Sequence, residues 1–189
     1  MRPTASLQHG ELRLEPADRG HLAQALIAVC ESQPDVHRAL PWIEWDQDIR
    51  TQLVEYLDEV NRLGRGGLSH HWAVYESTRL VGLIALDHTP HLTVGHWNLG
   101  YWIRNGCQGR GLASHSIDAV LEWIGRGGLT AVEIRVDPLN TAGVATAVST
   151  AHRWAGHRFE DGDRDVEFGE DLIFHHCWLI PRLPLEVSE

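Results

Sequence analysis

Residues 99–113 carry the pattern in this chain that is best suited to binding phosphate. A strand-like stretch ends near Ile103, Gly109 and Gly111 follow, and a helix-like stretch begins directly after them. Glycine can adopt a positive φ, so such a turn exposes backbone N–H groups at a helix N-terminus, where phosphate is stabilised. Arg110 could add a charge-assisted hydrogen bond. The lysine of a Walker loop and the Gly-x-Gly-x-x-Gly spacing of dinucleotide sites are both absent, so the segment is neither of these motifs, and a Gly-x-Gly spacing alone is a weak signal for phosphate.

Four short segments resemble the GNAT superfamily of N-acetyltransferases. Gln108-Gly-Arg-Gly-Leu-Ala113 is similar to the Gln/Arg-x-x-Gly-x-Gly/Ala signature of that superfamily. The other three resemble segments of its RimJ/RimL branch, which acetylates protein N-termini: Gly100-Tyr-Trp-Ile103, Val136-Asp-Pro-Leu-Asn140 and Leu40-Pro-Trp42. The likeness covers nearly the whole chain, about residues 12–180.

The resemblance implies acetyl-CoA as the co-substrate. Backbone amides after Gln108 would hold its pyrophosphate, and the strand end near Ile103 would pair with the pantetheine arm. Asn140 would bond the pantetheine or fix the splay between two strands; capping the helix after Pro138 is an alternative role, and both can hold together. The candidate cofactor-binding residues are Ile103, Gln108, Gly109, Arg110, Gly111, Leu112, Ala113 and Asn140.

The leaving sulfur needs a proton donor, and here the chain departs from the family pattern. The family's serine, three positions after the motif asparagine, would fall on Gly143, which has no hydroxyl. Counting back from Gly156, in a segment that looks like the family's Gly-Phe pair, leads instead to the neighbourhood of Ser149. Ser149 is therefore the candidate acid, with Thr146 and Thr150 close by. The alternative is a helix hydroxyl that bonds only its own backbone.

The acceptor amine must be neutral when it attacks. An α-amine, with a pKa of about 7.7–8.0, needs only a weak base near neutral pH. Counting forward from His157 without gaps places Glu167 where RimL-like enzymes carry a glutamate, so Glu167 is the candidate base. The alternative is a solvated member of the acidic segment 160–171, which could still attract a cationic N-terminus. His96 is a further candidate base.

An aromatic segment near the N-terminus is a candidate wall for the acceptor. Trp42 and Trp45 stand beside Glu44 and Asp46 in the helical arm, where their rings could line a peptide groove. We take Trp42 and Glu44 as candidate substrate-binding residues, with ordinary packing as the alternative. The tryptophans expected in the core are Trp72, Trp102, Trp123 and Trp178.

The elements that must position these residues follow from periodicity and capping signals. Strands are expected at 11–15, 71–75, 80–86, 97–103, 132–136 and 172–180, and helices after Asp18, between Pro34 and Pro41, at 48–63, after Gly111 and at 140–155. The acidic segment 160–171 is expected to be a turn or hairpin tip. The pattern predicts a mixed α+β fold. The resemblance implies a GNAT-like twisted, mixed, largely antiparallel sheet with helices on both faces. We expect one GNAT domain over residues 1–189, with a helical arm at about 17–66 and an acetyl-CoA-binding half at about 95–157.

Composition excludes several classes of function. The 189 residues carry 16 basic side chains, all arginine, against 26 acidic ones, so a protein that binds nucleic acid by bulk positive charge is disfavoured and a cationic substrate is compatible. Residues 1–10 lack the apolar core of a signal peptide, and the longest apolar run, 80–86, is too short for a membrane span. Three scattered cysteines and 13 histidines show no metal-ligand spacing. We expect a cytoplasmic protein without metal, nucleic-acid or membrane partner; a homodimer is left open.

Together these features predict an acetyl-CoA-dependent N-acetyltransferase that modifies a primary amine, with a protein or peptide N-terminal α-amine as the RimL-like substrate. A small amine (an antibiotic, a polyamine or an amino-acid derivative) is the first alternative. The second is a non-catalytic acyl-CoA-binding module, because the family's serine position falls on Gly143.

Overall fold

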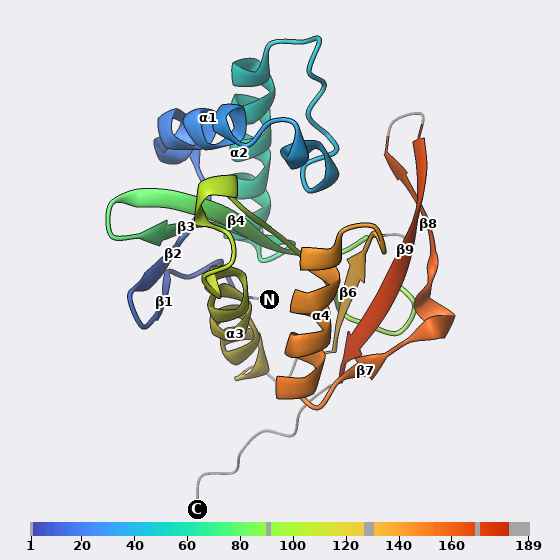
Figure 1. Ribbon diagram of the computed structural model, residues 1–189. Coiled ribbons are helices and arrows are strands. Elements are labelled where there is room, and N and C mark those ends of the chain that lie inside the picture. Colours follow the sequence, from blue (N-terminus) through green and yellow to red (C-terminus); the bar gives the residue numbers. More distant parts are fainter. Residues whose placement is uncertain (1, 90–91, 127–130, 169–170, 182–189) are drawn as a thin grey trace, which may run out of the picture. The chain divides into compact units, whose positions relative to one another are not determined.

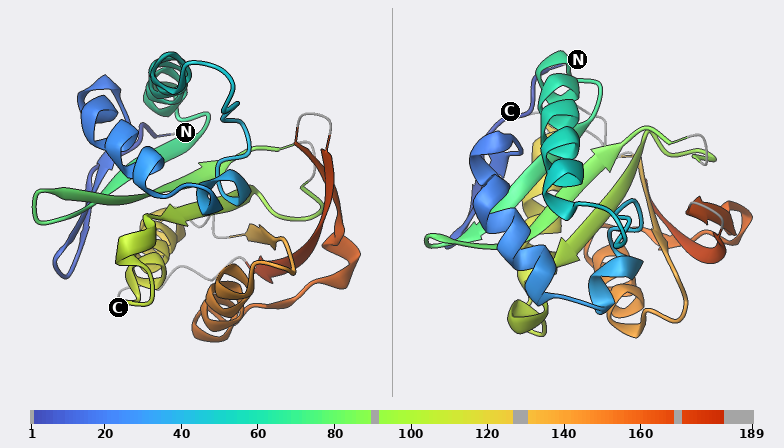
Figure 2. Two further views of the ribbon diagram at one scale, coloured as in Figure 1. Left: turned by 45° about the horizontal axis from the view of Figure 1, so that its top comes forward. Right: turned by 90° about the horizontal axis from the view of Figure 1, so that it is seen from above.

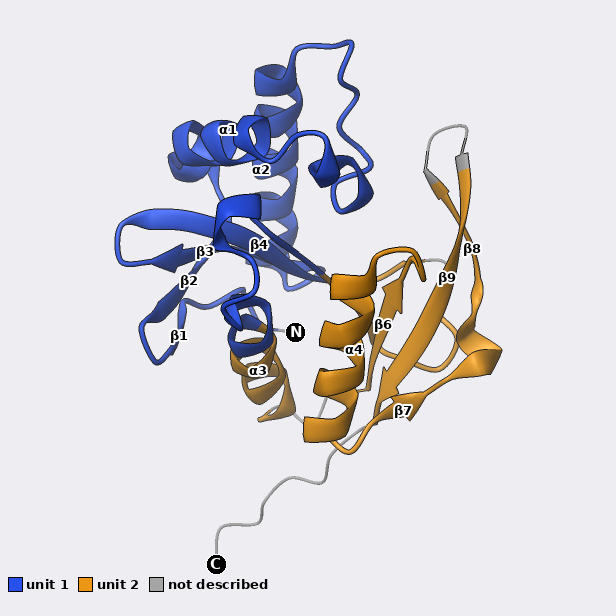
Figure 3. Cartoon of the chain, viewed as in Figure 1, with its two compact units in different colours: residues 1–86, 101–116 blue, residues 87–100, 117–189 orange. Residues whose placement is uncertain are grey.

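The computed structural model describes residues 2–89, 92–126, 131–168 and 171–181. The chain forms two compact units, coloured separately in Figure 3. The first comprises residues 1–86 and 101–116, and the second comprises residues 87–100 and 117–189. Strand β5 (Trp97–Ile103) and helix α3 (Leu112–Gly125) contribute residues to both units.

The first unit combines an antiparallel sheet with two α-helices (Figure 1). Its elements are β1 (Leu7–His9), β2 (Leu12–Pro16), η1 (Arg19–His21), α1 (Leu22–Glu31), η2 (Asp35–Arg38), α2 (Ile49–Gly66), β3 (His70–Glu76), β4 (Arg79–Asp87) and η3 (Asn105–Cys107). The strands are hydrogen-bonded in the order β1-β2-β3-β4-β5. Helices α1 and α2 lie on one face of β2, β3 and β4, and the first turn of α3 lies on the other (Figure 2).

The register of this sheet explains which side chains enter its core. Leu12 and Leu14 of β2 are buried, whereas Arg13 between them is exposed, as the predicted alternation requires. Leu14 pairs with Val74 of β3. A Cβ atom at Gly82 of β4 would lie 2.2 Å from the carbonyl oxygen of Trp102, so only glycine permits this approach of β4 to β5.

Helix α2 confirms the predicted amphipathic helix and its two end signals. The Asp48 carboxylate accepts a hydrogen bond from the backbone N–H of Thr51 at 2.9 Å, which caps the N-terminus. At the other end Gly67 adopts a left-handed φ of 67°. The apolar side, which includes Leu53 and Leu57, is buried.

The second unit contains the remaining elements. They are β6 (Val132–Val136), α4 (Thr141–Arg153), β7 (His157–Arg158), η4 (Glu160–Gly162), β8 (Arg164–Phe168) and β9 (Asp171–Ile180), together with the first half of β5 and the second part of α3. The strands are hydrogen-bonded in the order β5-β6-β9-β7, and β8 also pairs with β9. The β5–β6 pairing is parallel, whereas β6, β7 and β8 are all antiparallel to β9. Helix α4 packs on β6 and β9.

The predicted fold class is confirmed: the chain is α+β, with a mixed, largely antiparallel open sheet. One prediction is right only in part, because the segment 160–171 contains the turn η4 and the end of the β8–β9 hairpin but also a strand. The acidic segment 160–171 is not simply a turn, because Arg164–Phe168 forms β8, in which Asp165 pairs with Phe174 of β9. The strand was not recognised because the many acidic residues of this segment show no alternation of apolar and polar side chains. The short strands β1 and β7 were not predicted, because two or three residues are too few to show a period.

The expected core tryptophans Trp72, Trp102, Trp123 and Trp178 are all buried. Among the described residues, no helix is both long enough and apolar enough to cross a membrane.

Candidate functional site

The backbone between β5 and α3 has the geometry expected of a phosphate loop. Gly109 and Gly111 have φ values of 75° and 76°, in the left-handed region that favours glycine. The Gly111 carbonyl accepts a hydrogen bond from His115 N–H at 3.0 Å, so the first turn of α3 starts directly after the second glycine. The amides of that first turn have no acceptor within the helix, so they are able to bind an anion.

The space around the two glycines is open. A Cβ atom at Gly109 would have no neighbour within 4 Å, and one at Gly111 would meet only His115 Cε1, at 3.8 Å. A diphosphate could therefore approach this backbone without displacing protein atoms. The open backbone and its free amides have the hydrogen-bond polarity that a diphosphate group requires.

The side chain of Gln108 forms hydrogen bonds within the loop. Its amide nitrogen donates hydrogen bonds to the carbonyl oxygen of Ile103, at 2.9 Å, and to Oδ1 of Asn105, at 3.1 Å. Asn105 in turn donates from its backbone N–H to Ser32 Oγ and from its side chain to Asp35 Oδ2, at 3.2 and 2.9 Å. The loop is therefore fixed to the segment between α1 and η2 before any ligand binds.

Arg104 is a loop residue that sequence reasoning missed. It is 7% exposed, its Nε donates to a Glu31 carboxylate oxygen at 3.0 Å, and its Nη1 contacts the Leu80 carbonyl at 3.3 Å. The backbone N–H of Arg104 donates a hydrogen bond to the carbonyl oxygen of Val81 at 2.9 Å. Arg104 thus joins β4, α1 and the loop. The only signal in the sequence was an arginine directly after an apolar strand.

Arg110 forms an ion pair with Glu76 of β3. Its two terminal nitrogens donate to both carboxylate oxygens of Glu76, at 3.0 and 2.5 Å. These hydrogen bonds, with the negative charge of Glu76, raise the pKa of Arg110 above its ordinary value. The predicted contact of Arg110 with a phosphate would have to compete with this forked ion pair.

The strands β5 and β6 separate within the second unit. Their described register comprises only Trp97 with Val132 and Asn98 with Glu133, although β6 continues to Val136. Leu99 and Gly100 of β5 therefore have no register partner on β6. Strand edges freed in this way present backbone N–H and C=O groups to an extended ligand.

Asn140 has the capping role that was expected as one alternative. Its Oδ1 accepts a hydrogen bond from Gly143 N–H at 2.9 Å, at the start of α4. A Cβ atom at Gly143 would lie 2.7 Å from Asn140 Nδ2 and 2.8 Å from Val136 Cγ1. The glycine at the family's serine position therefore has a steric reason: a serine there would displace the capping side chain. A contact of Asn140 with pantetheine stays a prediction.

The hydroxyls of α4 differ in their partners. Ser149 is exposed, and its Oγ accepts a hydrogen bond from Arg153 Nη1 at 2.7 Å. Thr146 donates to the Ala142 carbonyl at 3.0 Å, as a helix hydroxyl often does. Thr150 is buried, and its hydroxyl has no partner among the described residues.

The candidate base Glu167 lies on β8, where it pairs with Leu172 of β9. Its side chain is exposed, and no hydrogen bond or ion pair with the described residues engages its carboxylate. A carboxylate in this state is able to accept a proton. His96 is also exposed, and its ring lies 6.1 Å from that of His88.

A buried carboxylate in β6 was missed by sequence reasoning. Glu133 is fully buried. Its Oε1 accepts three backbone hydrogen bonds, from Thr93, Val94 and Gly95, at 2.9, 2.7 and 2.6 Å. Its Oε2 contacts the guanidinium of Arg135. Burial alone would raise its pKa, but the amides and Arg135 outweigh burial and lower the pKa of Glu133. The carboxylate fixes the segment that leads into β5. A glutamate between two apolar strand residues was the available signal.

The candidate acceptor residues Trp42 and Glu44 lie in the first unit, between η2 and α2. The Trp42 ring stacks on Tyr56 of α2, with centroids 4.5 Å apart, and the side chain remains 37% exposed. The exposed Glu44 is held through its backbone N–H, which donates to Gln52 Oε1 at 2.8 Å. Trp42 is therefore packed on one face and open on the other, which is compatible with both the groove and the packing interpretation.

The candidate residues are distributed over the two units. Ile103, residues 108–113, Trp42 and Glu44 belong to the first unit, and Asn140, Ser149 and Glu167 belong to the second. Among the residues that the structure describes, no group of three or more His, Cys, Asp or Glu side chains could hold a metal ion.

Comparison with known proteins agrees with this geometry. Several solved structures of acetyltransferases are similar over most of their length. RimL, a ribosomal L7/L12 alpha-N-protein acetyltransferase in complex with coenzyme A, has a TM-score of 0.77 at 17% identity, covering 93% of this chain and 97% of that one. The ribosomal-protein-S5-alanine acetyltransferase from Vibrio fischeri has a TM-score of 0.76 at 10% identity, covering 94% and 97%. The microcin C7 self immunity acetyltransferase, bound to acetyl-CoA and AMP, has a TM-score of 0.72 at 13% identity, covering 90% and 92%.

At these identities the solved structures establish the fold alone. No curated protein sequence matches the chain. Residues 11–149, however, match a family model described as an acetyltransferase (GNAT) domain, and this stretch includes the loop, β5, β6 and the start of α4. The chain therefore belongs to the GNAT acetyltransferase family and is an N-acetyltransferase.

Proposed function

We propose that this enzyme transfers the acetyl group of acetyl-CoA to the α-amine at the N-terminus of a protein or peptide. The observation that carries the proposal is the open, glycine-defined backbone between β5 and α3 in a chain of the GNAT family. Support for a polypeptide acceptor comes from fold neighbours that acetylate ribosomal proteins and that align along more than nine-tenths of this chain.

The residues present fit acetyl-CoA, which supplies the acetyl thioester when bound. The amides of residues 109–113 would hold the pyrophosphate, and Ile103, at the end of β5, would align the pantetheine arm by backbone hydrogen bonds. Asn140, already fixed by its bond to Gly143, would contact the same arm. Arg110 would contribute charge after partial release from Glu76.

Proton transfer is assigned to the second unit. Glu167 would take a proton from the acceptor ammonium, directly or through one water, since its carboxylate has no partner among the described residues. Ser149 would protonate the departing sulfur. The hydrogen bond from Arg153 to Ser149 Oγ supports this role, because a guanidinium donor makes the hydroxyl a better proton donor.

Acceptor recognition is assigned to Trp42 and Glu44. The open face of the indole would contact the first residues of the peptide, and the exposed carboxylate of Glu44 would attract its cationic end. We retain the cytoplasm as the proposed compartment, because Cys30, Cys107 and Cys177 are all free thiols.

The decisive experiment incubates the purified chain with acetyl-CoA and two matched sets of acceptors. One set holds short peptides with free N-termini, each beside its Nα-acetylated twin; the other holds small amines, namely an aminoglycoside, a polyamine and an amino-acid amide. Free thiol release and mass spectrometry report transfer. We expect the free peptides to be acetylated once, at the α-amine, and the blocked twins to be inert.

Two outcomes contradict the proposal. Transfer to small amines but not to peptides identifies a small-amine acetyltransferase. This alternative is retained because a microcin C7 self immunity acetyltransferase has a similar fold. Binding of acetyl-CoA without turnover on either set identifies an acyl-CoA-binding module.

A further inference from the structure

Two histidines border the phosphate loop, and none of the assignments above uses them. His115 is exposed in the first turn of α3, and His9 is half-buried at the end of β1. Their rings stack, with centroids 5.7 Å apart and an interplanar angle of 28°. Both residues belong to the first unit, as the loop does, so the whole arrangement lies within one compact unit.

The ring of His115 lies beside the second glycine of the loop. Its Cε1 is 3.8 Å from the position of a Cβ atom at Gly111. The His115 N–H donates to the Gly111 carbonyl at 3.0 Å, so the two residues are one helical turn apart. Side chains of a helix point back toward its N-terminus. The imidazole therefore borders the backbone amides that are proposed to bind the diphosphate.

The ring nitrogens of His115 are available to a ligand. No hydrogen bond or ion pair with the described residues engages them. The next carboxylate along α3 belongs to Asp118, and it accepts hydrogen bonds from Arg153 and Trp154 at 2.9 and 2.8 Å. Glu11 is exposed in the turn that follows β1. An imidazole donates one hydrogen bond when neutral and two when protonated, so His115 is able to bind an anion.

The strand register places further charges on the same face of the sheet. His9 pairs with Leu12, Leu12 with Glu76, and Glu76 with Arg79. Residues opposite one another share a face, so these four form one row. The carboxylate of Glu76 is bound to Arg110, whereas Arg79 is exposed and has no hydrogen bond or ion pair with the described residues. The one carboxylate in this row is thus occupied, and Arg79 is a second cation that a phosphate could reach.

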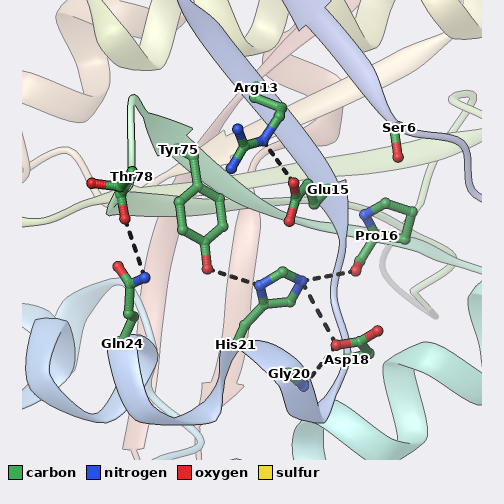
Figure 4. Close-up of a pocket in the computed structure, with 10 residues that line it drawn as sticks. All are labelled: Ser6, Arg13, Glu15, Pro16, Asp18, Gly20, His21, Gln24, Tyr75 and Thr78. Carbon is green, nitrogen blue, oxygen red and sulfur yellow. Dashed lines mark hydrogen bonds and ion pairs between the residues drawn. The ribbon is translucent and has the colours of Figure 1, made fainter.

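The opposite face of these strands carries a cavity of about 640 Å³ (Figure 4). Successive strand residues point to opposite faces, so Tyr75 lines this cavity on the face turned away from the loop. There its hydroxyl lies 2.8 Å from His21 Nδ1, and Arg13 Nε is paired with Glu15 at 2.6 Å. These polar groups engage one another, whereas the ring nitrogens of His115 face no partner among the described residues.

The charge of the two rings indicates which phosphate suits them. CoA carries a diphosphate, with one charge on each phosphorus, and a 3′-phosphomonoester on the same ribose, which is close to dianionic near neutral pH. Two stacked imidazoles that are both protonated repel one another, and a dianion offsets that repulsion. The uncharged amides of the loop suit the diphosphate, so the monoester is the better match for the histidines.

We propose that His115, supported by the stacked ring of His9, recognises the 3′-phosphate of acetyl-CoA and makes this enzyme selective for CoA over 3′-dephospho-CoA. The inference rests on the proposed function, because it takes the loop as the site of the diphosphate. His115 is a specificity-determining residue and takes no part in acetyl transfer.

The test measures the affinities of the full-length chain for CoA and for 3′-dephospho-CoA by isothermal titration calorimetry. We expect the parent chain to bind CoA about tenfold more tightly, as one hydrogen-bonded charge pair allows. His115→Gln, which removes the charge, should reduce this ratio to about twofold, and His9→Gln should reduce it to about fourfold. His115→Arg restores a cation and should keep the ratio near tenfold.

A second readout separates charge from shape. An imidazole ordinarily changes its charge between pH 5 and 8, so a bound dianion should draw protons onto the histidines. Titrations near pH 7 in two buffers with different ionisation enthalpies count those protons. We expect the parent chain to take up more protons with CoA than with 3′-dephospho-CoA, and His115→Gln to abolish the difference.

Two variants are the controls, and each is first compared with the parent chain by its thermal melt. His152→Gln makes the same change at an exposed histidine of α4, and Arg79→Gln removes the competing cation. Neither should change the ratio by more than about 1.5-fold. Loss of the ratio in Arg79→Gln, with the ratio kept in His115→Gln, would place the monoester at Arg79 and overturn the role of His115.

Failure of this inference is distinguishable from failure of the proposed function. Equal affinity of the parent chain for the two compounds would overturn the inference and leave the CoA site intact. Absence of CoA binding would overturn both.

Discussion

The loop at residues 103–113 and the region from α4 to β8 are built in different ways. In the loop, the proposed ligand-binding groups are backbone amides, placed by two glycines with positive φ and by the start of a helix. From α4 to β8 the proposed groups are the side chains of Ser149 and Glu167, on a helix and on a strand.

This difference decides how much substitution each region tolerates. Backbone amides are present whatever the side chains are, so the loop depends mainly on the residues that set its φ angles. Side-chain sites depend on each residue and on the elements that hold it. The chain illustrates the contrast: the loop keeps the family signature, whereas glycine occupies the family's serine position.

The largest effect is expected from Gly111→Glu. Any side chain is strained at a φ of 76°, and the new carboxylate would lie against the pyrophosphate that the loop is proposed to hold. We expect CoA affinity to fall by more than about 100-fold, measured by isothermal titration calorimetry.

The matched control for this change is Gly106→Ala in the same connection. Gly106 has no positive φ, and a Cβ atom there would meet nothing within 4 Å. CoA binding should be unchanged in this variant. Parent-like affinity of Gly111→Glu would remove the phosphate loop from this segment.

The next largest effect is expected at Glu133, the buried carboxylate of β6 that holds residues 93–95. Glu133→Gln replaces a charge bound by three amides and Arg135, so we expect the free energy of unfolding at neutral pH to fall by about 3 kcal/mol. The folded-state pKa of Glu133 lies below its ordinary value of 4.5. Its stabilisation is therefore complete above about pH 4.5 and is lost as the pH falls through the folded-state pKa.

Urea unfolding at several pH values checks this expectation. The difference between the parent chain and Glu133→Gln should shrink on acidification. Glu55→Gln, which changes an exposed carboxylate of α2, should leave stability nearly unchanged at every pH. A difference that does not depend on pH would show that Glu133 acts through packing and not through its charge.

Local sequence patterns predicted most elements, because the signals of strands, caps and glycine turns lie within a few residues. Asp48 and Gly67 bracket α2, and Gly109 and Gly111 mark the loop. The prediction failed where pairing partners are distant: β8 is a strand because it pairs with β9, not because its acidic sequence alternates.

In the candidate site, too, features set by neighbouring residues could be predicted from the sequence, whereas contacts between distant residues could not. The glycine turn before α3 could be expected from its spacing, and the capping role of Asn140 from its place before a helix. The binding of a pyrophosphate by the turn was implied by the family resemblance and stays a prediction. The tie between Arg104 and Glu31 joins residues that are far apart in the sequence, so no local pattern contained it. The same holds for Glu133, whose amide partners come from residues 93–95. The proton-transfer roles of Ser149 and Glu167 stay predictions.

A smaller effect is expected from Glu167→Gln. At low pH the acceptor α-amine is mostly protonated and depends on a base, whereas at high pH it is already neutral. We expect kcat/KM to fall about 30-fold near pH 6 and less than about threefold near pH 9. Asp165→Asn, two residues away on the same strand face, is the control for the bulk charge of the acidic segment.

The two variants distinguish catalysis from attraction. A base changes the shape of the pH–rate profile, whereas an attracting charge raises KM at every pH. Equal effects of Glu167→Gln and Asp165→Asn, with parallel profiles, would rule out Glu167 as the base.

The smallest effect returns to the loop and tests whether any of its side chains matters. Glu76→Gln weakens the forked pair that holds Arg110, so the guanidinium becomes more available to a phosphate. We expect CoA to bind about threefold more tightly, and the gain to disappear in the double variant with Arg110→Gln. Calorimetry at low and moderate salt measures both. Weaker binding in Glu76→Gln would mean that the ion pair preorganises the loop. CoA binding by the loop would then depend on side chains as well as on backbone amides, and the two regions would differ less than proposed.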